Sequence, residues 1–288
     1  MACTRFLESE YPQEKPELAG FHIIPVPLER TVSYGAGARL GPQAILDASF
    51  QLEDWDGTSR PGELGFHTQA PVDCEGSVEA VLERIAERVR QALAWGACPV
   101  VLGGEHTVTY GPVMALCGQD RDFGIVHVDA HCDLRAEYEG DPFSHACVLR
   151  RIEDDFGLPL AQFATRDYCR EERDYRESRG ILHWDAATLA RGGLPAMPLP
   201  ASFPRRLYVT FDVDGFDSSL MPATGTPSPG GLFWHDALRL LEACAAEREI
   251  IGFDVVELAP IQGLHHADFT AAKLVHALMG LAQRSMRL

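Results

Sequence analysis

The stretch Asp129-Ala130-His131-Cys132-Asp133 follows directly on the short apolar run 125–128. Side chains on an extended backbone alternate between its two faces, so residues 129, 131 and 133 can converge on one point. Carboxylate oxygens and an imidazole nitrogen suit a divalent first-row ion such as Mn²⁺ better than a structural Zn²⁺, which prefers thiolates. The stretch therefore predicts the end of a buried strand and part of a metal site.

Further short apolar runs alternate with helical patterns along the chain. The expected strands are 21–27, 98–102, 124–128, 161–164, 207–211 and 250–256. The expected helices are 42–50, 77–95, a segment after His106, 145–156, 235–248 and a last one from about Asp268. Continuous apolar strands between helices are typical of a parallel sheet covered on both faces, so the expected fold class is α/β with a mostly parallel central sheet.

The helix after Ser77 has the clearest pattern. Val81, Leu82, Ile85 and Val89 recur every three or four residues and define one buried face. Ser77 is a favoured N-cap residue, and the glycine at 96 is a favoured helix end. The pattern predicts a helix that packs on the sheet along one side.

The sequence predicts a short N-terminal arm followed by one domain. Residues 1–20 have no apolar centre and predict a loose N-terminal arm, followed by a single domain at 21–288. The segments 53–74 and 192–204 are rich in turn formers and predict loops, while 166–179 is a charged segment without an assigned element. No internal repeat, low-complexity tract or linker is evident, so one domain is the simplest expectation.

Composition narrows the classes of partner. The 288 residues include 25 Lys and Arg against 42 Asp and Glu, a net charge of −17. This charge argues against nucleic acid or an anionic membrane as a partner and is compatible with a cationic substrate. Eight cysteines without a C-x-x-C pair predict free thiols. No signal peptide pattern or membrane span is evident, so a cytoplasmic protein is expected.

Four expected strands share one property, which is that each delivers polar side chains where it ends. These side chains are His106, the Asp129/His131/Asp133 group, the Asp212/Asp214 pair and Glu257. Ligands bind outside the carboxyl ends of strands in open α/β sheets, so we expect these groups to face one crevice. A lone D-x-D pair or a lone histidine after a strand more often caps an element or hydrogen-bonds within a core, whereas the Asp129/His131/Asp133 group alone already favours a metal. Together, four aspartates and two histidines suit a pair of ions.

Four motifs give the chain a resemblance to a known family. They are Gly103-Gly104-Glu105-His106, Asp129-Ala130-His131-Cys132-Asp133, Phe211-Asp212-Val213-Asp214 with Ala223-Thr224-Gly225-Thr226-Pro227, and Asp254-Val255-Val256-Glu257-Leu258-Ala259-Pro260. In order and spacing the chain resembles the ureohydrolases, the arginase/agmatinase family, and is most similar to agmatinases. The resemblance implies an arginase-like three-layer α/β/α sandwich and a site for two Mn²⁺ ions, with Ni²⁺, Fe²⁺ or Co²⁺ as possible replacements.

The resemblance also implies roles for individual residues. One ion would bind His106, Asp129, Asp133 and Asp212; the other would bind Asp129, His131, Asp212 and Asp214. The implied reaction hydrolyses a guanidino compound to urea and an amine. Asp214 would accept a proton, Glu257 would hold the guanidinium NH groups, and His145 would protonate the leaving amine. His127 shares the parity of the ligands but lies inside the strand, where we expect a core or supporting role.

The loop after the central motif, 134–141, bears on the substrate. It carries three acids and no Asn, which favours a distal ammonium over a carboxylate and hence agmatine, with putrescine as the second product. Glu137 and Tyr138 are the expected contacts to the substrate tail, and Arg135 is the counter-argument because it could accept a carboxylate. Aminopropylagmatine, guanidinobutyrate, guanidine and formiminoglutamate remain alternatives.

Two departures from the family pattern and two rival classes complete the expectations. Cys132 stands where many relatives have Thr or Ser, and 162–166 departs from the Gly-Ile-Arg that agmatinases often show; both bear on substrate identity.

A catalytically decayed relative is the first rival class, and it would lack some of the ligands. A metal-dependent deacetylase would use one ion. Family members usually assemble as trimers or hexamers, so a homo-oligomer is expected.

Overall fold

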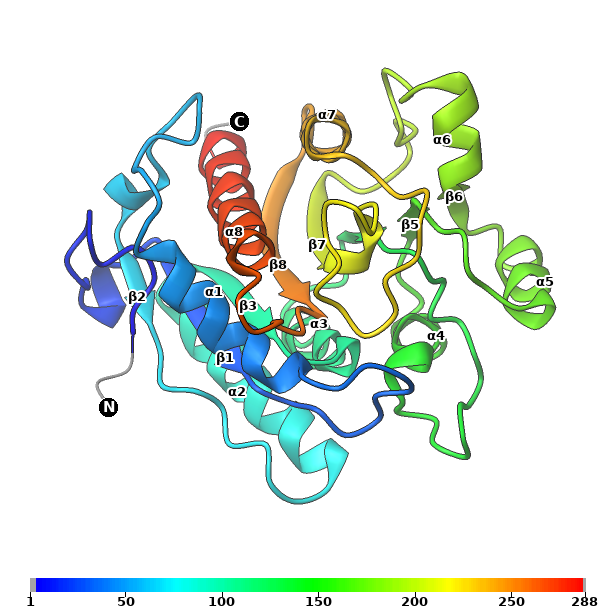
Figure 1. The fold of residues 1–288 in the computed structure, drawn as a ribbon, viewed down its shortest axis with the longest axis horizontal. Coiled ribbons are helices and arrows are strands. Elements are labelled where there is room, and N and C mark those ends of the chain that lie inside the picture. The colour runs from blue at the N-terminus through cyan, green and yellow to red at the C-terminus, as the bar shows by residue number, and fades with distance from the viewer. Residues whose placement is uncertain (1–3, 287–288) are drawn as a thin grey trace.

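A single sheet of eight strands runs through the computed structural model, which describes residues 4–286 (Figure 1). The strands are β1 (Phe21–Val26), β2 (Phe66–Thr68), β3 (Cys98–Gly103), β4 (Gly124–Val128), β5 (Leu160–Phe163), β6 (Leu182–Trp184), β7 (Arg206–Asp212) and β8 (Glu249–Val256). Their order in the sheet is β2-β1-β3-β8-β7-β4-β5-β6, and every neighbouring pair is parallel. The predicted α/β fold with a parallel central sheet is confirmed.

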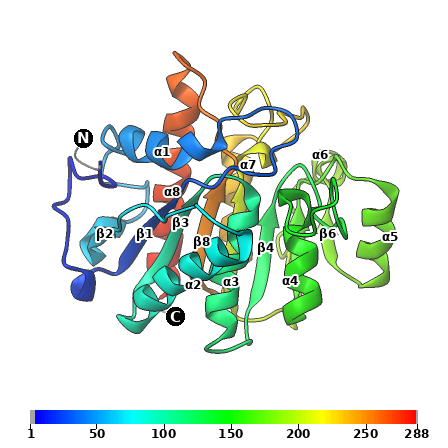
Figure 2. The same ribbon diagram turned by 90° about the horizontal axis from the view of Figure 1, so that it is seen from below.

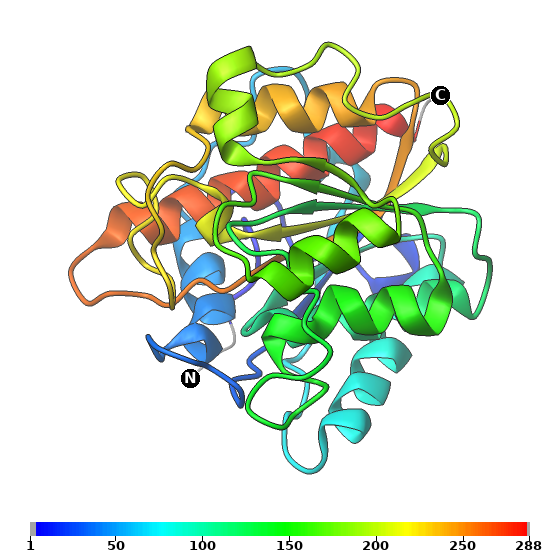
Figure 3. The ribbon, with the colours of Figure 1, turned by 90° about the vertical axis from the view of Figure 1, so that its right-hand side faces the viewer.

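Helices cover both faces of this sheet. Within the described residues they are α1 (Gly41–Ser49), α2 (Val78–Ala94), α3 (Tyr110–Cys117), α4 (Val148–Phe156), α5 (Arg170–Ser178), α6 (Ala186–Gly192), α7 (Trp234–Ala245) and α8 (His265–Ser285). Helices α1, α7 and α8 share one core with the sheet, and α2, α3 and α4 pack on the other face (Figures 2 and 3). The molecule is therefore a three-layer α/β/α sandwich.

Side chains alternate between the two faces of each strand, and both faces of the sheet are shielded from solvent. In β1, Phe21 and Ile23 join the core under α1 and α8, whereas Ile24 and Val26 join the core under α2. All six residues of the strand are buried. A strand covered on both faces is apolar at most positions, which is why these segments read as nearly continuous apolar runs; His22, the polar residue of β1, is buried with its Nε2 2.8 Å from the Pro16 carbonyl oxygen.

The four strands that end in polar side chains are neighbours in the sheet, in the order β3-β8-β7-β4. Their order in the sheet differs from their order in the sequence, because β8 and β7 lie between β3 and β4. All four run in the same direction, so their carboxyl ends lie together at one edge. This arrangement brings side chains from positions 106 to 257 into one crevice.

The N-terminal segment packs more closely than expected. Phe6 and Leu7 are almost fully buried in the core beside α1, and the backbone N–H of Leu7 donates to Ser49 Oγ at 2.9 Å. Two apolar residues are enough to anchor the segment, although its composition is mostly polar. Over residues 4–20 the loose packing predicted for the arm is thus not observed; residues 1–3 lie outside the described part of the chain.

Two strands and two helices were not predicted from the sequence. Strands β2 and β6 have three residues each and lie at the two edges of the sheet, and β2 falls within the predicted loop 53–74. Helix α5 forms in the charged segment 166–179, and its buried residues are the polar Glu172 and Arg176. Helix α6 forms between that segment and the loop from 193 onward. Short edge strands and a helix with a polar buried face lack the apolar periodicity on which the predictions rest.

Other expectations are confirmed. Ser77 Oγ caps α2 by accepting from the backbone N–H of Ala80, and Gly96 adopts φ +73° just beyond the end of that helix. The cysteines of residues 4–286 are free thiols, and Cys3 lies outside that range. Among the described helices, none has the length and apolar character needed to cross a lipid bilayer.

Candidate metal centre

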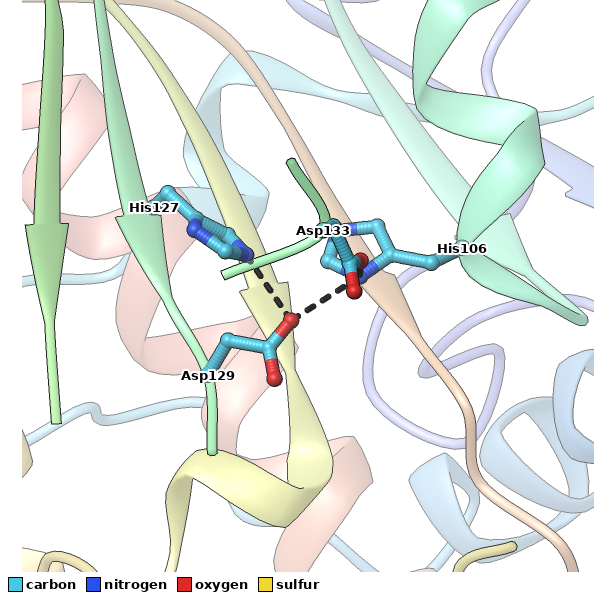
Figure 4. A group of neighbouring side chains, drawn as sticks. All are labelled: His106, His127, Asp129 and Asp133. Carbon is cyan, nitrogen blue, oxygen red and sulfur yellow. Dashed lines mark hydrogen bonds and ion pairs between the residues drawn. The ribbon is translucent and has the colours of Figure 1, made fainter. Parts of the chain in front are cut away.

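The first group of metal-competent atoms surrounds the ring of His106, which follows β3. Its Nδ1 lies 3.1 Å from Asp129 Oδ2, 3.0 Å from Asp133 Oδ2 and 3.4 Å from Asp212 Oδ2. Figure 4 shows the His106 and Asp133 side chains converging with that of Asp129. The side chains of His106, Asp129, Asp133 and Asp212 are all buried.

A second group forms around His131. Its Nδ1 lies 3.3 Å from Asp129 Oδ1 and 3.2 Å from Asp214 Oδ2. The two oxygens of Asp129 therefore face different groups, Oδ2 toward His106 and Oδ1 toward His131. That is the geometry required of a carboxylate that bridges two ions. The structure thus brings together all six predicted ligands from β3, β4 and β7.

Local turns explain how residues two apart come side by side. Asp129 Oδ1 accepts from the backbone N–H of His131 at 2.6 Å, and Asp212 Oδ1 accepts from that of Asp214 at 2.8 Å. A carboxylate bonded to the backbone two residues on forms an Asx turn. Strand β4 ends at 128, so convergence here comes from this turn rather than from the strand alternation predicted. Both metal motifs use the same device.

Asp133 is held in a sparsely populated backbone conformation with φ +53°. Its carbonyl accepts from the backbone N–H of Arg150, within helix α4, at 3.0 Å. The helix therefore anchors a strained residue whose side chain completes the first group. Glu257 shows a similar arrangement, with φ +65° and a backbone bond to the Gly104 carbonyl at 2.8 Å.

His106 presents a free lone pair to the carboxylates. Thr210 Oγ1 donates to Asp254 Oδ1 at 2.6 Å, so it can only accept from His106 Nε2–H, which lies 2.9 Å away. The proton therefore sits on Nε2, and Nδ1 is a buried nitrogen without a hydrogen-bond partner among the described residues. An orphaned imidazole nitrogen among three carboxylate oxygens fits a metal ligand oriented by hydrogen bonds from behind.

Electrostatics of the aspartates also favour a cation. Burial, with the charges of Asp214 and Asp129, raises the pKa of Asp212 well above its ordinary range. Burial likewise raises the pKa of Asp214, with Asp129 adding to the effect. Despite burial, the imidazoles of His127 and His131 hold the pKa of Asp129 well below its ordinary range. Crowded carboxylates repel one another, and divalent ions between them would relieve that repulsion.

His127 lies close enough to be mistaken for a ligand, as Figure 4 shows. Its Nε2 is 2.8 Å from Asp129 Oδ2, and Gln162 Nε2 lies 3.1 Å from its Nδ1 and 2.7 Å from the Cys132 carbonyl. The Gln162 amide can only donate from its nitrogen, so His127 Nδ1 accepts and Nε2–H donates to Asp129. His127 therefore orients the bridging carboxylate, in line with the supporting role predicted. Gln162 was missed because its partners lie on another strand.

Glu257 lies beside the first group. Its Oε1 accepts from the backbone N–H of His106 at 2.7 Å, which leaves Oε2 for another donor. Burial raises the pKa of Glu257 to about 8, although the His106 N–H opposes this change. A guanidinium ion beside the carboxylate would favour the charged form. This position suits the predicted contact to guanidinium NH groups.

A cavity of about 230 Å³ opens over these side chains. Its wall includes His131, Asp133, Asp212, Asp214, Glu257, His145 and Tyr138, all singled out from the sequence. Glu137 is not part of the wall: it is exposed, contrary to prediction. The backbone groups of Tyr138 and Asp141 pair across a two-residue turn with positive φ at both Glu139 and Gly140, and this tight hairpin brings in Tyr138 while Glu137 faces solvent.

Further wall residues were missed. They include Tyr34 from the loop before α1, and Asp167 and Glu172 from the segment around α5, whereas Thr224 and Thr226 belong to a motif recognised in the sequence without a role assigned to them. Tyr34, Asp167 and Glu172 carry little signal in the sequence, because they come from segments whose positions depend on the whole fold. Arg135 also lines the cavity; it stacks over the Tyr138 ring at 5.1 Å and pairs with the buried Glu172 at 3.8 Å.

The two departures from the family pattern lie away from the cavity wall. Cys132 is fully buried, and its Sγ accepts from Arg176 Nη1 at 3.5 Å. Ala164 has φ +69°. Arg166 donates to the carbonyls of Asp214, at 2.6 Å, and Ser228, at 2.9 Å, and so fixes the loop after β7. These residues support the site from behind rather than contacting a substrate.

Comparison with known proteins agrees with this fold and site. The sequence matches the arginase family over residues 19–280. An N(1)-aminopropylagmatine ureohydrolase of Thermus thermophilus is 38% identical, with 96% of this chain and 94% of that protein covered. One of Synechocystis sp. is 35% identical, covering 98% and 95%. The crystal structure of agmatine ureohydrolase of Thermoplasma volcanium matches with a TM-score of 0.88 and 28% identity, covering 100% of this chain and 97% of that chain.

The α/β/α sandwich with a His/Asp metal centre at the carboxyl edge of its sheet defines a metal-dependent hydrolase. The chain belongs to the arginase family. The predicted family and fold are therefore confirmed, and the rival deacetylase class is not supported. The individual ligand assignments and catalytic roles stay predictions.

The donor set fits the two ions that the family implies. His106, Asp129, Asp133 and Asp212 would hold one, and Asp129, His131, Asp212 and Asp214 the other. When bound, such ions activate water and stabilise negative charge as it develops. Glu257 is placed to orient the guanidinium group, and His145 lies on the same cavity wall, where it can pass a proton to a leaving amine.

Proposed function

We propose that this protein hydrolyses the guanidinium group of a cationic polyamine-type substrate and releases urea. The observation that carries the proposal is the pair of ligand groups sharing Asp129, with Glu257 and His145 on the same cavity wall. A guanidinium carbon is a poor electrophile, so its hydrolysis needs an activated water, a fixed substrate and a proton donor for the amine. The site offers a residue or ligand set for each requirement.

Two Mn²⁺ ions per chain are the proposed cofactor. The ligands are carboxylates and imidazoles without a thiolate, a set that suits manganese better than structural zinc. Ni²⁺, Fe²⁺ and Co²⁺ accept the same ligand types. Metal analysis of the purified protein, followed by reloading of the chelated protein with each ion, identifies the ion that restores urea release.

The charge of the cavity supports a cationic substrate tail. Asp167 and Glu172 lie on the wall, and Arg135 is the lone arginine or lysine among its described residues. Because Glu172 and the Tyr138 ring both engage Arg135, its guanidinium is less available to a substrate carboxylate. An ammonium is therefore favoured over a carboxylate at the distal end, which supports agmatine and its N(1)-aminopropyl derivative over arginine, guanidinobutyrate and formiminoglutamate.

Between these two amines, the comparisons favour the longer one. Relatives at 35% and 38% identity are named N(1)-aminopropylagmatine ureohydrolases, while a relative named agmatinase, from Pyrococcus horikoshii, follows at 34%. We therefore propose aminopropylagmatine as the preferred substrate and agmatine, the substrate favoured by the sequence, as the second candidate. The products are urea with spermidine or putrescine, respectively.

The test is urea release by the manganese-loaded protein, measured as kcat/KM for aminopropylagmatine, agmatine, arginine, guanidinobutyrate and guanidine. Formiminoglutamate is assayed by formamide release. We expect both cationic amines to exceed arginine and guanidinobutyrate by at least about 100-fold, since a mispaired buried charge costs several kcal/mol. Absence of turnover with both amines, or preference for a substrate with an anionic tail, would overturn the proposal.

The remaining expectations concern the setting of the enzyme. We propose a cytoplasmic homo-oligomer, a trimer or hexamer, that has neither nucleic acid nor a membrane as a partner. The acidic charge and the free thiols support this proposal. Sedimentation velocity of the native protein tests the assembly; a monomer at micromolar concentration would contradict it.

A further inference from the structure

Thr31, in the loop that precedes α1, contacts the proposed proton donor. Its Oγ1 lies 3.1 Å from His145 Nδ1 and 3.0 Å from the backbone nitrogen of His145. The same Oγ1 lies 3.2 Å from Glu105 Oε1. One hydroxyl thus meets three partners, on segments 114 and 74 residues away in sequence.

Glu105 fixes Thr31 from the other side. Its carboxylate is fully buried, and Oε2 accepts from the backbone N–H groups of Arg30 and Thr31, the latter at 2.8 Å. Farther along this loop, Glu29 Oε1 accepts from the backbone N–H of Gly37 at 2.9 Å. Two carboxylates therefore hold the loop at both ends, and Thr31 has little freedom to leave His145.

Proton counting decides the direction of each bond. A hydroxyl has one proton to donate and two lone pairs that accept. The Glu105 carboxylate can only accept, and the backbone N–H of His145 can only donate. The Thr31 proton therefore goes to Glu105, and the bond to the His145 ring exists only if Nδ1 carries a proton and donates it to Thr31. If Thr31 instead donated its proton to His145 Nδ1, no proton would lie between the Thr31 hydroxyl oxygen and Glu105 Oε1, which are 3.2 Å apart.

We propose that Thr31 is a positioning residue that holds His145 in the form protonated at Nδ1. In this form Nε2 is the nitrogen that exchanges protons, and Nε2 has no hydrogen-bond partner among residues 4–286. His145 lies on the cavity wall beside Tyr138, whose ring packs edge-on against it with the ring centroids 6.1 Å apart. This inference rests on the proposed function, in which His145 delivers a proton to the leaving amine.

Ser144 is the alternative partner for the same nitrogen. Its Oγ lies 3.4 Å from His145 Nδ1, which is longer than the Thr31 contact and near the limit for a hydrogen bond. Ser144→Ala is therefore the matched control, because it removes a hydroxyl next to the same ring nitrogen. Thr31→Val removes the Thr31 hydroxyl at constant shape, and Thr31→Ser restores it.

The first test reads the tautomer directly and does not depend on turnover. The protein is labelled with ¹⁵N-histidine and loaded with diamagnetic Zn²⁺, and the His145 signals are assigned by their loss in His145→Gln. We expect the wild type, Thr31→Ser and Ser144→Ala to show protonation at Nδ1, and Thr31→Val to show a mixture of both neutral forms. A wild-type ring protonated at Nε2 alone would overturn the inference.

The second test uses urea release by the manganese-loaded protein. We expect Thr31→Val to lower kcat by about 10- to 100-fold with KM changed less than about threefold, because only the orientation of a proton donor is lost. Thr31→Ser should recover most of the rate, and Ser144→Ala should stay within about threefold of wild type. Wild-type kcat in Thr31→Val, or a larger loss in Ser144→Ala, would contradict the inference.

The two tests separate failure of the inference from failure of the proposed function. A wild type that releases no urea from any substrate removes the proposed function, whereas the NMR experiment still decides the tautomer. Should Thr31→Val lose stability, its melting temperature and metal content reveal it, and the Thr31→Ser and Ser144→Ala comparison then carries the test. Protonation at Nδ1 in the wild type and both variants, with each variant within about threefold of the wild-type kcat, supports the inference, and a wild-type ring protonated at Nε2 alone overturns it.

Discussion

Asp129 is the residue on which both halves of the metal centre depend. Its two oxygens face His106 and His131, and its Oδ1 also forms the turn that places His131. We expect Asp129→Asn to keep that turn, since an amide oxygen accepts the same bond, but to lose the negative charge. Bound manganese should fall from two ions to fewer than one per chain, and urea release should fall at least about 100-fold. Elemental analysis and the urea assay measure the two effects.

The matched control is Glu137→Gln, which removes a negative charge from the loop just after the motif. Glu137 is exposed and does not line the cavity, so metal content and kcat/KM should stay within about twofold of wild type. Full metal content in Asp129→Asn would contradict its bridging role. A large loss of affinity for the substrate in Glu137→Gln would instead restore the contact expected from the sequence.

His127 provides a test that separates a ligand from a supporting residue. Because its Nε2–H donates to Asp129, we expect His127→Asn to keep two bound ions but to weaken their affinity by about 10- to 100-fold. Gln162→Leu removes the group that fixes the His127 tautomer and should give a smaller change of the same kind. Competition with a chelator of known affinity measures both. Loss of one ion at saturating manganese in His127→Asn would show direct ligation.

At the scale of elements, the sequence predicted those whose apolar side chains repeat with a clear period. Helix α2 is an example, because the side chains of its buried face recur every three or four residues. Helix α5 went unassigned, because its buried face consists of two polar residues with partners on other segments: Glu172 accepts from the backbone N–H of Leu134, and Arg176 pairs with Asp185. Strands β2 and β6 are too short for alternation to show. Elements held by polar contacts across the fold cannot be recognised from local pattern.

Helix α8 carries a buried histidine with a consequence for stability. Burial lowers the pKa of His276 to about 4, and the charge of Lys273 adds to the effect. The unfolded chain, with an ordinary histidine pKa near 6.5, binds the proton first as the pH falls. The contribution of His276 to stability is therefore constant above about pH 6.5 and is lost progressively between pH 6.5 and 4.

We expect His276→Leu to show this loss by difference. Relative to the variant, the wild type should lose about 2 kcal/mol in the free energy of unfolding between pH 8 and pH 5, because each unit of pKa difference corresponds to about 1.4 kcal/mol. Urea denaturation of both proteins at several pH values measures it, and other titrating groups cancel in the comparison. A difference that stays constant from pH 8 to pH 5 would contradict the assignment.

For the whole molecule, metal binding should contribute directly to stability. Without ions, the buried carboxylates of Asp129, Asp133, Asp212 and Asp214 repel one another, as the raised pKa values of Asp212 and Asp214 indicate. An ion at 100 times its dissociation constant stabilises the folded state by about 2.7 kcal/mol. We therefore expect chelation to lower the melting temperature by roughly 5–10 °C, measured by scanning calorimetry. Asp129→Asn, already depleted of metal, should respond less than about 2 °C.

Some residues that support the metal centre could not be identified from the sequence. The motif residues were recognisable because their types and spacing carry chemistry on their own. Thr210, Gln162 and Thr31 act only through partners on other strands and loops, up to 114 residues away, and Ser or Thr hydroxyls are common in any sequence. The supporting residues of this centre therefore become visible only when the sheet is assembled.

The position of β8 has a consequence for synthesis of the chain. Strand β8 follows both β3 and β7 in the chain, yet it fills the gap between them in the middle of the sheet. Until the ribosome has made β8, β3 and β7 each have an unpaired side, a surface that favours aggregation. Contacts across such long separations also form slowly. Nascent chains of this protein should thus depend on chaperones until residue 256 has emerged, and only then can the bond between the His106 backbone and Glu257 form.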